Sequence, residues 1–256
     1  MTFPIEIKVN IDADIADALS TLAQPGGESQ KRLIWFAEHP RGVEDDRLLL
    51  DSGVIVRLRS GDTPDELTVK LRPCTTDQLT GRFSSPFDGE SFEYKIEEDW
   101  SGSRHVLSAS ATRAHPQGTL LNAVTPSAEA ADFLDTLQLR FLRECAPAVH
   151  ITELDTLGPI ASTKFNNVPL DSLEVDLERW TVADLDFLEL STRIKRKHDE
   201  KPHEFETRVE RKQKKLRSAV RDRGIAISQD PDNKTRRVLT ALATGHPETS
   251  TPLFRQ

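Results

Sequence analysis

The sequence predicts a single α+β domain built on an antiparallel β-barrel, and three observations lead to this prediction. Roughly eight short segments alternate apolar and polar residues or are rich in β-branched residues, as strands are. Helical segments interrupt them irregularly, which disfavours a parallel sheet in which strands and helices alternate strictly. The chain of 256 residues can bury a substantial core, and its hydrophobic content of 36% fits a folded protein.

The N-terminal part predicts a strand followed by a short helix. Residues 4–11 alternate apolar and polar side chains, which gives a strand with one buried face. Residues 11–24 carry apolar side chains at helical spacing, and Asp12 or Asp14 can cap this helix. A Pro-Gly-Gly run at 25–27 would end it.

The next part predicts a second strand and then a hairpin. Residues 31–36 indicate the strand, and 37–53 are polar and irregular. The β-rich runs 53–61 and 66–73 are joined by a short turn at 62–64, so they would pair as a hairpin.

The middle of the chain is expected to contain long loops. Residues 73–90 are rich in Thr, Ser, Pro, Gly and Asp and predict a loop, whereas 92–100 alternate again as a strand. Residues 101–126 hold many small residues and proline, so they are predicted to be mostly loop. Residues 127–145 carry an apolar stripe at helical spacing.

The C-terminal half predicts the remaining strands and two helices. Four further strand candidates occupy 149–156, 160–166, 172–180 and 184–194. Helices are expected over 203–223 and 234–243, which complete one domain over 1–243. The Pro- and Thr-rich residues 244–256 would form a flexible tail.

Composition narrows the classes of partner and compartment. The formal net charge of −8 does not favour a nucleic-acid partner, and the basic segment 193–223 also contains many acids, as a solvated helix does. Cys74 and Cys145 form no disulfide framework, so a reducing cytoplasm is expected. The N-terminus lacks a signal-peptide pattern and no apolar run could span a bilayer, so no membrane partner is expected. The oligomeric state stays open.

Basic side chains gather on the polar faces of two neighbouring predicted strands. Arg57 and Arg59 share one face of the third strand, and Lys70 and Arg72 share one face of the fourth. Charges on the wet face of an antiparallel sheet are ordinary solvation. Long basic side chains at i, i+2 on adjacent strands nevertheless concentrate like charge at a cost unless an anion is present. Acid pairs in the late strands suggest a separate cation site, and a polyphosphate with its metal needs both.

Motifs in a fixed order carry a family resemblance. They are PIEIK (4–8), WF (35–36), LLLDSGVIVRLR (48–59), LTVKLR (67–72), FEYKIEEDW (92–100), FLELS (187–191) and NKTRRVL (233–239). In kind and order they resemble the CYTH family of triphosphate-tunnel proteins. The resemblance spans nearly the whole chain and implies an eight-stranded antiparallel β-barrel with flanking helices, whose bore binds a triphosphate.

The resemblance also implies a set of site residues. The triphosphate would be held by seven basic residues: Lys8, Arg57, Arg59, Lys70, Arg72, Lys164 and Lys234. Mg²⁺ or Mn²⁺ would be held by Glu6, Asp176 and Glu189, with Glu93 and Glu178 as auxiliaries. The chain departs from the family pattern at Pro4 and Ser191, which stand where the family has acids. Each change removes a carboxylate, so weaker metal binding or lost activity is expected.

Three functions remain open from the sequence. The first is metal-dependent hydrolysis of inorganic triphosphate, a nucleoside triphosphate or thiamine triphosphate. The second is adenylyl cyclisation, the other reaction that the resemblance implies. The third is a catalytically degenerate protein that binds a triphosphate or polyphosphate nucleotide, which the departures at Pro4 and Ser191 favour.

Overall fold

The computed structural model of the protein describes residues 2–23, 28–39, 49–124, 130–151, 154–230 and 234–244. In this part of the chain the strands are β1 (Ile5–Ile11), β2 (Ser29–Glu38), β3 (Val54–Gly61), β4 (Asp65–Leu71), β5 (Phe87–Gly89), β6 (Phe92–Ser101), β7 (Arg104–His115), β8 (Asp155–Leu170), β9 (Leu173–Val182) and β10 (Leu185–Ile194). The α-helices are α1 (Ile15–Leu22), α2 (Thr136–Cys145), α3 (Pro202–Arg221) and α4 (Lys234–Thr244). Short 3₁₀-helices are η1 (Leu49–Ser52), η2 (Thr76–Gln78), η3 (Gly81–Ser84), η4 (Thr119–Val124) and η5 (Ala130–Phe133).

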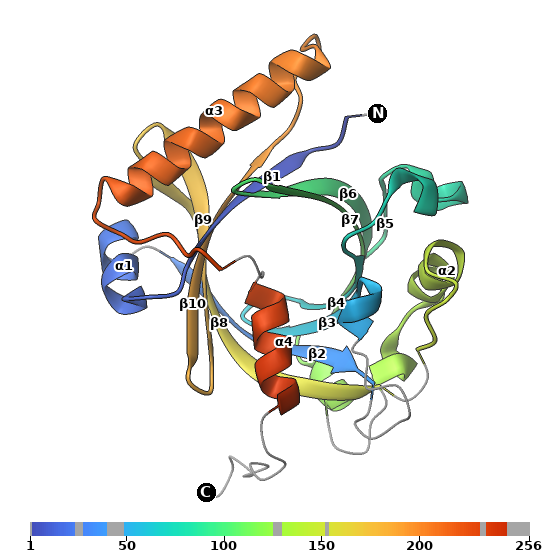
Figure 1. Ribbon diagram of the computed structural model, residues 1–256. Helices are drawn as coiled ribbons and strands as arrows, with labels where there is room; N and C mark the ends of the chain where they lie inside the picture. The colour runs from blue at the N-terminus through green and yellow to red at the C-terminus, as the bar shows by residue number, and fades with distance from the viewer. Residues whose placement is uncertain are drawn as a thin grey trace, which may run out of the picture.

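Nine of these strands close into a barrel, and β5 adds only a short flap to β6 (Figure 1). The order around the barrel is β1-β10-β9-β8-β2-β3-β4-β7-β6, and β6 pairs back with β1. Every neighbouring pair in the ring is antiparallel except β1 and β6, which run parallel over four residue pairs from Ile5–Glu98 to Lys8–Ser101. The predicted α+β barrel is therefore confirmed, with nine strands in a mixed ring rather than eight in an antiparallel one.

The extra strand is β7, which lies where a loop over 101–126 was predicted. Its central residues are small, and serine and alanine have little intrinsic preference for strands. The strand forms because β4 and β6 pair with it on both sides, and because Ala109 and Ala111 are completely buried under the outer layer. Tertiary pairing thus overrides the local preference of the sequence.

Two other boundaries differ from the prediction. The candidates 149–156 and 160–166 correspond to one strand, β8, which begins at Asp155. The helix predicted over 127–145 starts as an α-helix only at Thr136, because Asp135 caps it: the Asp135 carboxylate accepts the backbone N–H of Gln138 at 2.7 Å. Apart from Thr244, the predicted tail lies outside the described residues, as do the Pro-Gly-Gly run at 25–27, Leu48 and Asn233.

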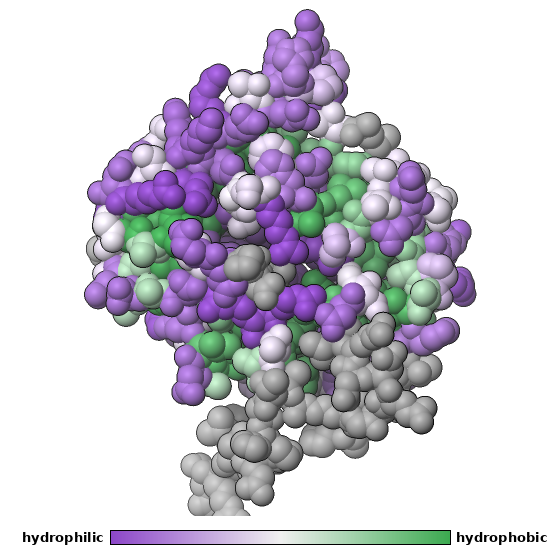
Figure 2. Space-filling model, in the orientation of Figure 1, coloured by the Kyte–Doolittle hydropathy of each residue, from purple (hydrophilic) through white to green (hydrophobic). Residues whose placement is uncertain are grey.

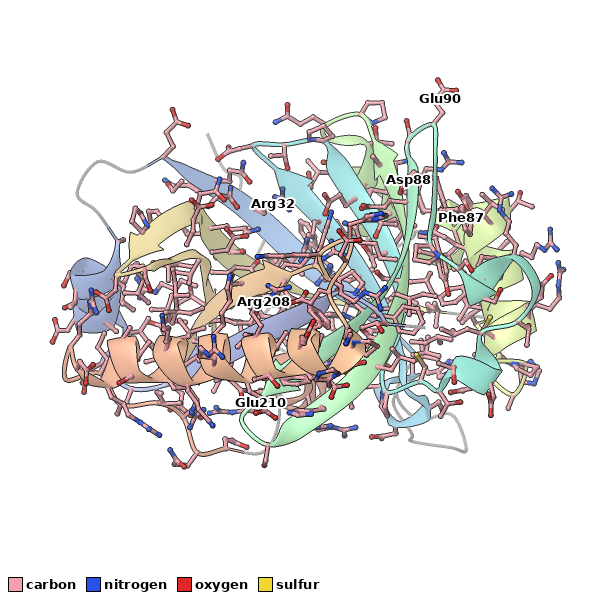
Figure 3. All side chains as sticks on the ribbon, turned by 90° about the horizontal axis from the view of Figure 1, so that it is seen from above. Arg32, Phe87, Asp88, Glu90, Arg208 and Glu210 are labelled. Carbon is pink, nitrogen blue, oxygen red and sulfur yellow. The ribbon has the colours of Figure 1, made fainter. Side chains whose placement is uncertain are left out.

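Helices and loops cover the outer face of the barrel. The outward residues Ile5, Ile7 and Val9 of β1 are buried beneath α1 and α3, which lie along one side (Figures 1 and 3). On the other side α2 and its loops cover β3, β4, β6 and β7. The mixed-charge helix predicted over 203–223 is confirmed as α3, on which Arg208 binds Glu200 through two contacts of 2.6 Å. No described helix is long and apolar enough to cross a membrane.

Apolar packing covers part of one end of the barrel. Val238 and Leu239 of α4 pack with Phe36, Trp180 and Phe187, which project inward from β2, β9 and β10. In Figure 1 this helix lies in front of part of the barrel opening. Figure 2 shows the same end from outside, with hydrophilic side chains gathered around the middle of the face and apolar patches between them.

Candidate functional site

The polar faces of the strands point inward and line a cavity of about 890 Å³ along the bore. In β1, for example, Glu6, Lys8 and Asn10 line this cavity, whereas the residues between them are buried on the outside. All seven predicted phosphate-binding residues and all three predicted metal ligands are among the lining residues. The structure therefore brings the predicted site residues into one cavity, although it does not test their roles.

The cavity is lined by charges of both signs. Among the described residues, the basic ones are Lys8, Arg57, Arg59, Lys70, Arg72, Lys95, Arg104, Lys164, Arg193, Arg217 and Lys234. The acidic ones are Glu6, Glu66, Glu93, Glu97, Glu174, Asp176, Glu178, Glu189 and Asp230. The basic and acidic residues nearly balance in number, so a bound anion is not needed to relieve repulsion throughout the bore. The expectation that basic side chains on adjacent strands would concentrate uncompensated positive charge is therefore wrong for the bore as a whole.

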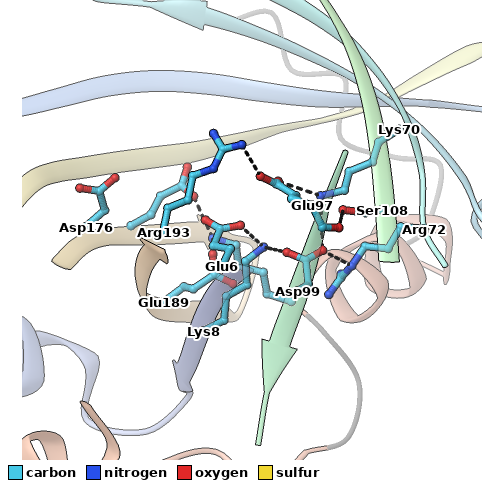
Figure 4. A network of polar contacts seen from close by, with 12 residues as sticks. Glu6, Lys8, Lys70, Arg72, Glu97, Asp99, Ser108, Asp176, Glu189 and Arg193 are labelled. Atoms are coloured by element: carbon cyan, nitrogen blue, oxygen red, sulfur yellow. Dashed lines mark hydrogen bonds and ion pairs between the residues drawn. The ribbon is translucent and has the colours of Figure 1, made fainter. Parts of the chain in front are cut away.

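A network of ion pairs joins β1, β4 and β6 through Asp99 (Figure 4). The Asp99 carboxylate lies 2.8 Å from Lys8 Nζ, 3.4 Å from Lys70 Nζ and 2.8 Å from Arg72 Nε. Burial alone would raise the pKa of Asp99, but the three cations hold it well below its ordinary value. Burial would likewise lower the pKa of Lys8, yet Asp99, Glu6 and Glu189 raise it above its ordinary value. Asp99 and Lys8 are therefore both ionised at neutral pH, whereas burial lowers the pKa of Lys70 below its ordinary value.

The predicted metal ligands do not form one cluster. In the described part of the chain, the one group of three carboxylates with oxygens within 4.8 Å of one another is Glu6, Glu97 and Asp99. The other two predicted ligands are each paired with a lysine: Asp176 lies 2.8 Å from Lys164, and Glu189 lies 3.3 Å from Lys234. Glu6 itself lies 2.9 Å from Lys8. The chain's own ammonium groups thus stand beside every carboxylate that was predicted to bind metal.

The end of the bore near α4 is the most buried part of the site. Lys234 Nζ lies 2.9 Å from Glu178, and it also stands 4.1 Å from the centre of the Trp180 ring. Burial would raise the pKa of Glu178, but the charges of Lys234 and Arg59 hold it well below its ordinary value. The Lys234 side chain is 7% exposed, whereas Glu93 near the opposite end is 45% exposed. The Lys234 side chain is therefore much more enclosed than that of Glu93.

Arg57 differs from the other basic residues on the inner face of the strands. Those others each have a carboxylate within 4.0 Å in the described part of the chain, whereas Arg57 has none. Its Nε–H group is buried and donates to no partner among the described residues. Burial and the neighbouring charge of Arg59 lower the pKa of Arg57 to about 9, which leaves the guanidinium charged at neutral pH but destabilised. Glu178 and Glu66 attract Arg57 without coming within 4.0 Å of it, so Arg57 is a partly buried cation with no ion pair in the described part of the chain.

Two members of the network were missed at the sequence level. Asp99 follows Glu93, Lys95 and Glu97 on the inner face of β6, so continuing the alternation by two residues would have found it. Arg32 of β2, which lies 3.6 Å from Glu66, was not among the predicted residues. Pro4 lies just before β1 and does not line the cavity, whereas Ser191 does.

Comparisons with known proteins support the fold. No protein-family model matches the chain, and no curated protein sequence matches it either. Among solved structures, it is similar to a Hippeastrum protein, HpAC1, which is described as an adenylyl cyclase candidate with a dominant triphosphatase activity. The identity is 14% and the TM-score 0.56, over 94% of this chain and 96% of that one. A Bacillus halodurans protein named as an adenylate cyclase candidate gives 13% identity and a TM-score of 0.53, over 92% of this chain and 97% of that one. At these identities the similarity establishes the fold, and the chain therefore has the tunnel-barrel fold that its resemblance to the CYTH family predicts.

Proposed function

We propose that the protein binds a triphosphate-bearing small molecule in its bore and hydrolyses it with the help of Mg²⁺ or Mn²⁺. The observation that supports this most directly is Arg57, a partly buried guanidinium in the wall of the cavity that has no carboxylate of the described residues within ion-pair distance. A buried charge is costly unless it is paired. A phosphate oxygen entering the bore would give Arg57 the partner that the folded chain does not provide.

The other basic residues of the bore would bind further oxygens along the triphosphate chain. Arg59 follows Arg57 on the inner face of β3, and a guanidinium can hold two phosphate oxygens at once. Lys70 and Arg72 approach from β4 on the adjacent side. Charge stabilisation and alignment are most of what phosphoryl transfer to water requires of a protein, and no covalent intermediate is needed. The closed wall would limit the access of other water to the phosphates.

The carboxylates that line the bore are chemically suited to bind a divalent metal ion. Glu6 and Glu189 offer hard oxygens of the type that Mg²⁺ and Mn²⁺ prefer, and both already attract a cation, because both raise the pKa of Lys8. Asp176 would complete the predicted set from β9. When bound, such an ion would neutralise phosphate oxygens and lower the pKa of a bound water. Binding would require Lys8, Lys164 and Lys234 to give up contacts with these carboxylates.

Phosphate release tests the proposed activity. Purified protein is incubated with inorganic triphosphate, ATP or thiamine triphosphate, with and without Mg²⁺ or Mn²⁺. We expect metal-dependent release of phosphate from at least one of them, and a loss of at least about 100-fold in Glu189→Gln, because removal of one charge-stabilising group costs about that much. Cyclic AMP and pyrophosphate from ATP would instead indicate a cyclase. No turnover under any of these conditions would contradict the proposed hydrolysis.

The second candidate is a binder without catalysis, and the lysine contacts of the predicted metal ligands favour it. Asp176 and Glu189 are each within 3.3 Å of an ammonium group, and Ser191 offers no charge between them. An ion would therefore bind more weakly than in a bore with free carboxylates. A thermal-shift titration with inorganic triphosphate separates the two candidates, since stabilisation without turnover would select the binder.

Restoring the missing acid should strengthen metal binding. Ser191 lies opposite Lys8 of β1 and Asp176 of β9, and it lines the cavity. Ser191→Glu adds a carboxylate at that point, and calorimetry should show an affinity for Mn²⁺ about tenfold higher, since ligand charge tunes affinity. Thr207→Glu adds the same charge on the exposed side of α3 and should leave the affinity unchanged. Equal gains in both variants would show that the effect comes from net charge and not from the site.

A further inference from the structure

Asp99 is the most deeply buried carboxylate of the inner network. It has no exposed surface, while the three cations that contact it keep between 12% and 17% of their side-chain surface exposed. The carboxylate is also absent from the cavity lining, which includes Lys8, Lys70 and Arg72. Asp99 therefore lies behind the cations, in the wall, and the cations lie between it and the cavity.

The arrangement of the strands brings cations to Asp99 from both sides of β6. It lies opposite Glu6 across the short parallel pairing of β1 and β6, which closes the barrel. On its other side β7 separates β6 from β4, and the small side chains of Ser108 and Ser110 on the inner face of β7 leave room above this strand. Lys70 and Arg72 of β4 can therefore cross β7 to reach Asp99 (Figure 4). The Asp99 carboxylate thus contacts cations from both sides of the pairing of β1 with β6 that closes the barrel.

We propose that Asp99 is a positioning residue, which holds Lys8, Lys70 and Arg72 together so that their charges converge on the phosphates of the ligand. This inference rests on the proposed function, because the ligand is the triphosphate proposed above. Without Asp99, Glu6 would still lie 2.9 Å from Lys8 and Glu97 3.9 Å from Lys70, but Arg72 would lose its described carboxylate and no single anion would join the three cations. They would repel and separate, and each would then meet a ligand phosphate at an added cost in conformational entropy. Ordering the groups in advance avoids that cost.

A purely electrostatic role predicts the opposite effect. A carboxylate that merely competes with the ligand for the same cations weakens binding, so its removal should make triphosphate bind more tightly. The sign of the change in affinity therefore distinguishes the two roles. Stability does not distinguish them, because removing Asp99 takes a carboxylate away from three partly buried cations in either case.

The test compares two substitutions that each remove one negative charge from β6, one on its inner face and one on its outer face. The affinity for inorganic triphosphate is measured by calorimetry with Mg²⁺ for the unchanged protein, for Asp99→Asn and for Glu98→Gln. Glu98 does not line the cavity, and its contact with Trp100 Nε1 is a hydrogen bond that a glutamine oxygen can also accept. We expect Asp99→Asn to weaken binding at least tenfold, and Glu98→Gln to leave it unchanged. Tighter binding by Asp99→Asn, or no change, would overturn the proposal.

Two further measurements keep the outcome interpretable. Asp99→Glu keeps the charge on a longer side chain and should bind at least threefold more tightly than Asp99→Asn; if the asparagine variant does not fold, weaker binding by Asp99→Glu than by the unchanged protein is the supporting result. A crystal structure of unliganded Asp99→Asn needs no ligand at all. Separated Lys8 and Arg72 head groups would support the proposal, and unchanged positions would overturn it, even if the protein does not bind triphosphate and the proposed function fails.

Discussion

Arg57→Met should abolish the stabilisation of the protein by triphosphate while making the unliganded protein no less stable. The guanidinium forms no ion pair in the described part of the chain, and burial outweighs the attraction of Glu178 and Glu66, so its charge destabilises the folded state. Replacing poorly compensated buried charge with an apolar side chain of similar length is neutral or stabilising by roughly 1–3 kcal/mol. Loss of two charge-assisted hydrogen bonds to phosphate should weaken binding by about 100-fold. Thermal denaturation with and without inorganic triphosphate measures both effects.

The matched control for this prediction is Arg179→Met. Arg179 lies outside the bore, where it binds Asp186 through contacts of 2.6 and 2.9 Å, and about a third of its side chain is exposed. This change should cost at most about 1 kcal/mol of stability and leave triphosphate binding intact. Undiminished stabilisation of Arg57→Met by triphosphate would show that the ligand does not bind in the described cavity.

Lys234→Met should destabilise the protein by about 3 kcal/mol at neutral pH. The ammonium group lies between Glu178 and Glu189, and removing one member of a buried ion pair leaves an uncompensated charge. The same change also removes the only described cation on the face of Trp180. Chemical denaturation monitored by circular dichroism measures the loss. Arg236→Met on the same helix breaks an exposed pair with Asp51 and should cost under about 1 kcal/mol.

The pH dependence of this variant follows from the pKa of Glu178. In the unchanged protein Lys234 helps to hold that pKa well below its unfolded value, so the ionised carboxylate contributes stability until the pH falls through the low folded value. Without Lys234, Arg59 is the main remaining cation that opposes burial, and we expect the pKa of Glu178 to rise above its unfolded value. The folded variant then binds more protons than the unfolded chain, and its stability improves as the pH falls from 7 toward 5. A deficit that stays constant over this range would contradict the proposed role of Lys234.

The sequence predicted which side chains face inward better than it predicted their partners. Alternation in a single strand is a local property, so the inner positions of Arg57, Arg59 and Lys70 could be assigned from the strand alone. Which carboxylate each of them meets depends on which strands become neighbours. Asp99 meets Lys70 only because β7 lies between their strands with small side chains, and β7 is the strand that local preference could not reveal.

The same limitation explains the metal ligands. The motif resemblance placed Glu6, Asp176 and Glu189 in one cavity, and the structure confirms that they line it. It could not show that Lys164 and Lys234 would stand beside two of them, because Lys164 comes from β8 and Lys234 from a helix that follows the last strand. The contact between Lys164 and Asp176 also follows a register shift in the pairing of β8 with β9, which no strand pattern predicts.

The short parallel pairing of β1 with β6 limits the order in which the strands can pair during synthesis. β1 is made first, yet its long antiparallel partner is β10, which is made near the other end of the domain. Until β10 has left the ribosome, β1 can pair only with β6, over four residue pairs. Contacts between such distant parts of a chain form slowly. Until they form, the unpaired edges of the strands can pair with other chains and cause aggregation. Nascent chains halted before β10 should therefore lack a closed bore and depend most on chaperones.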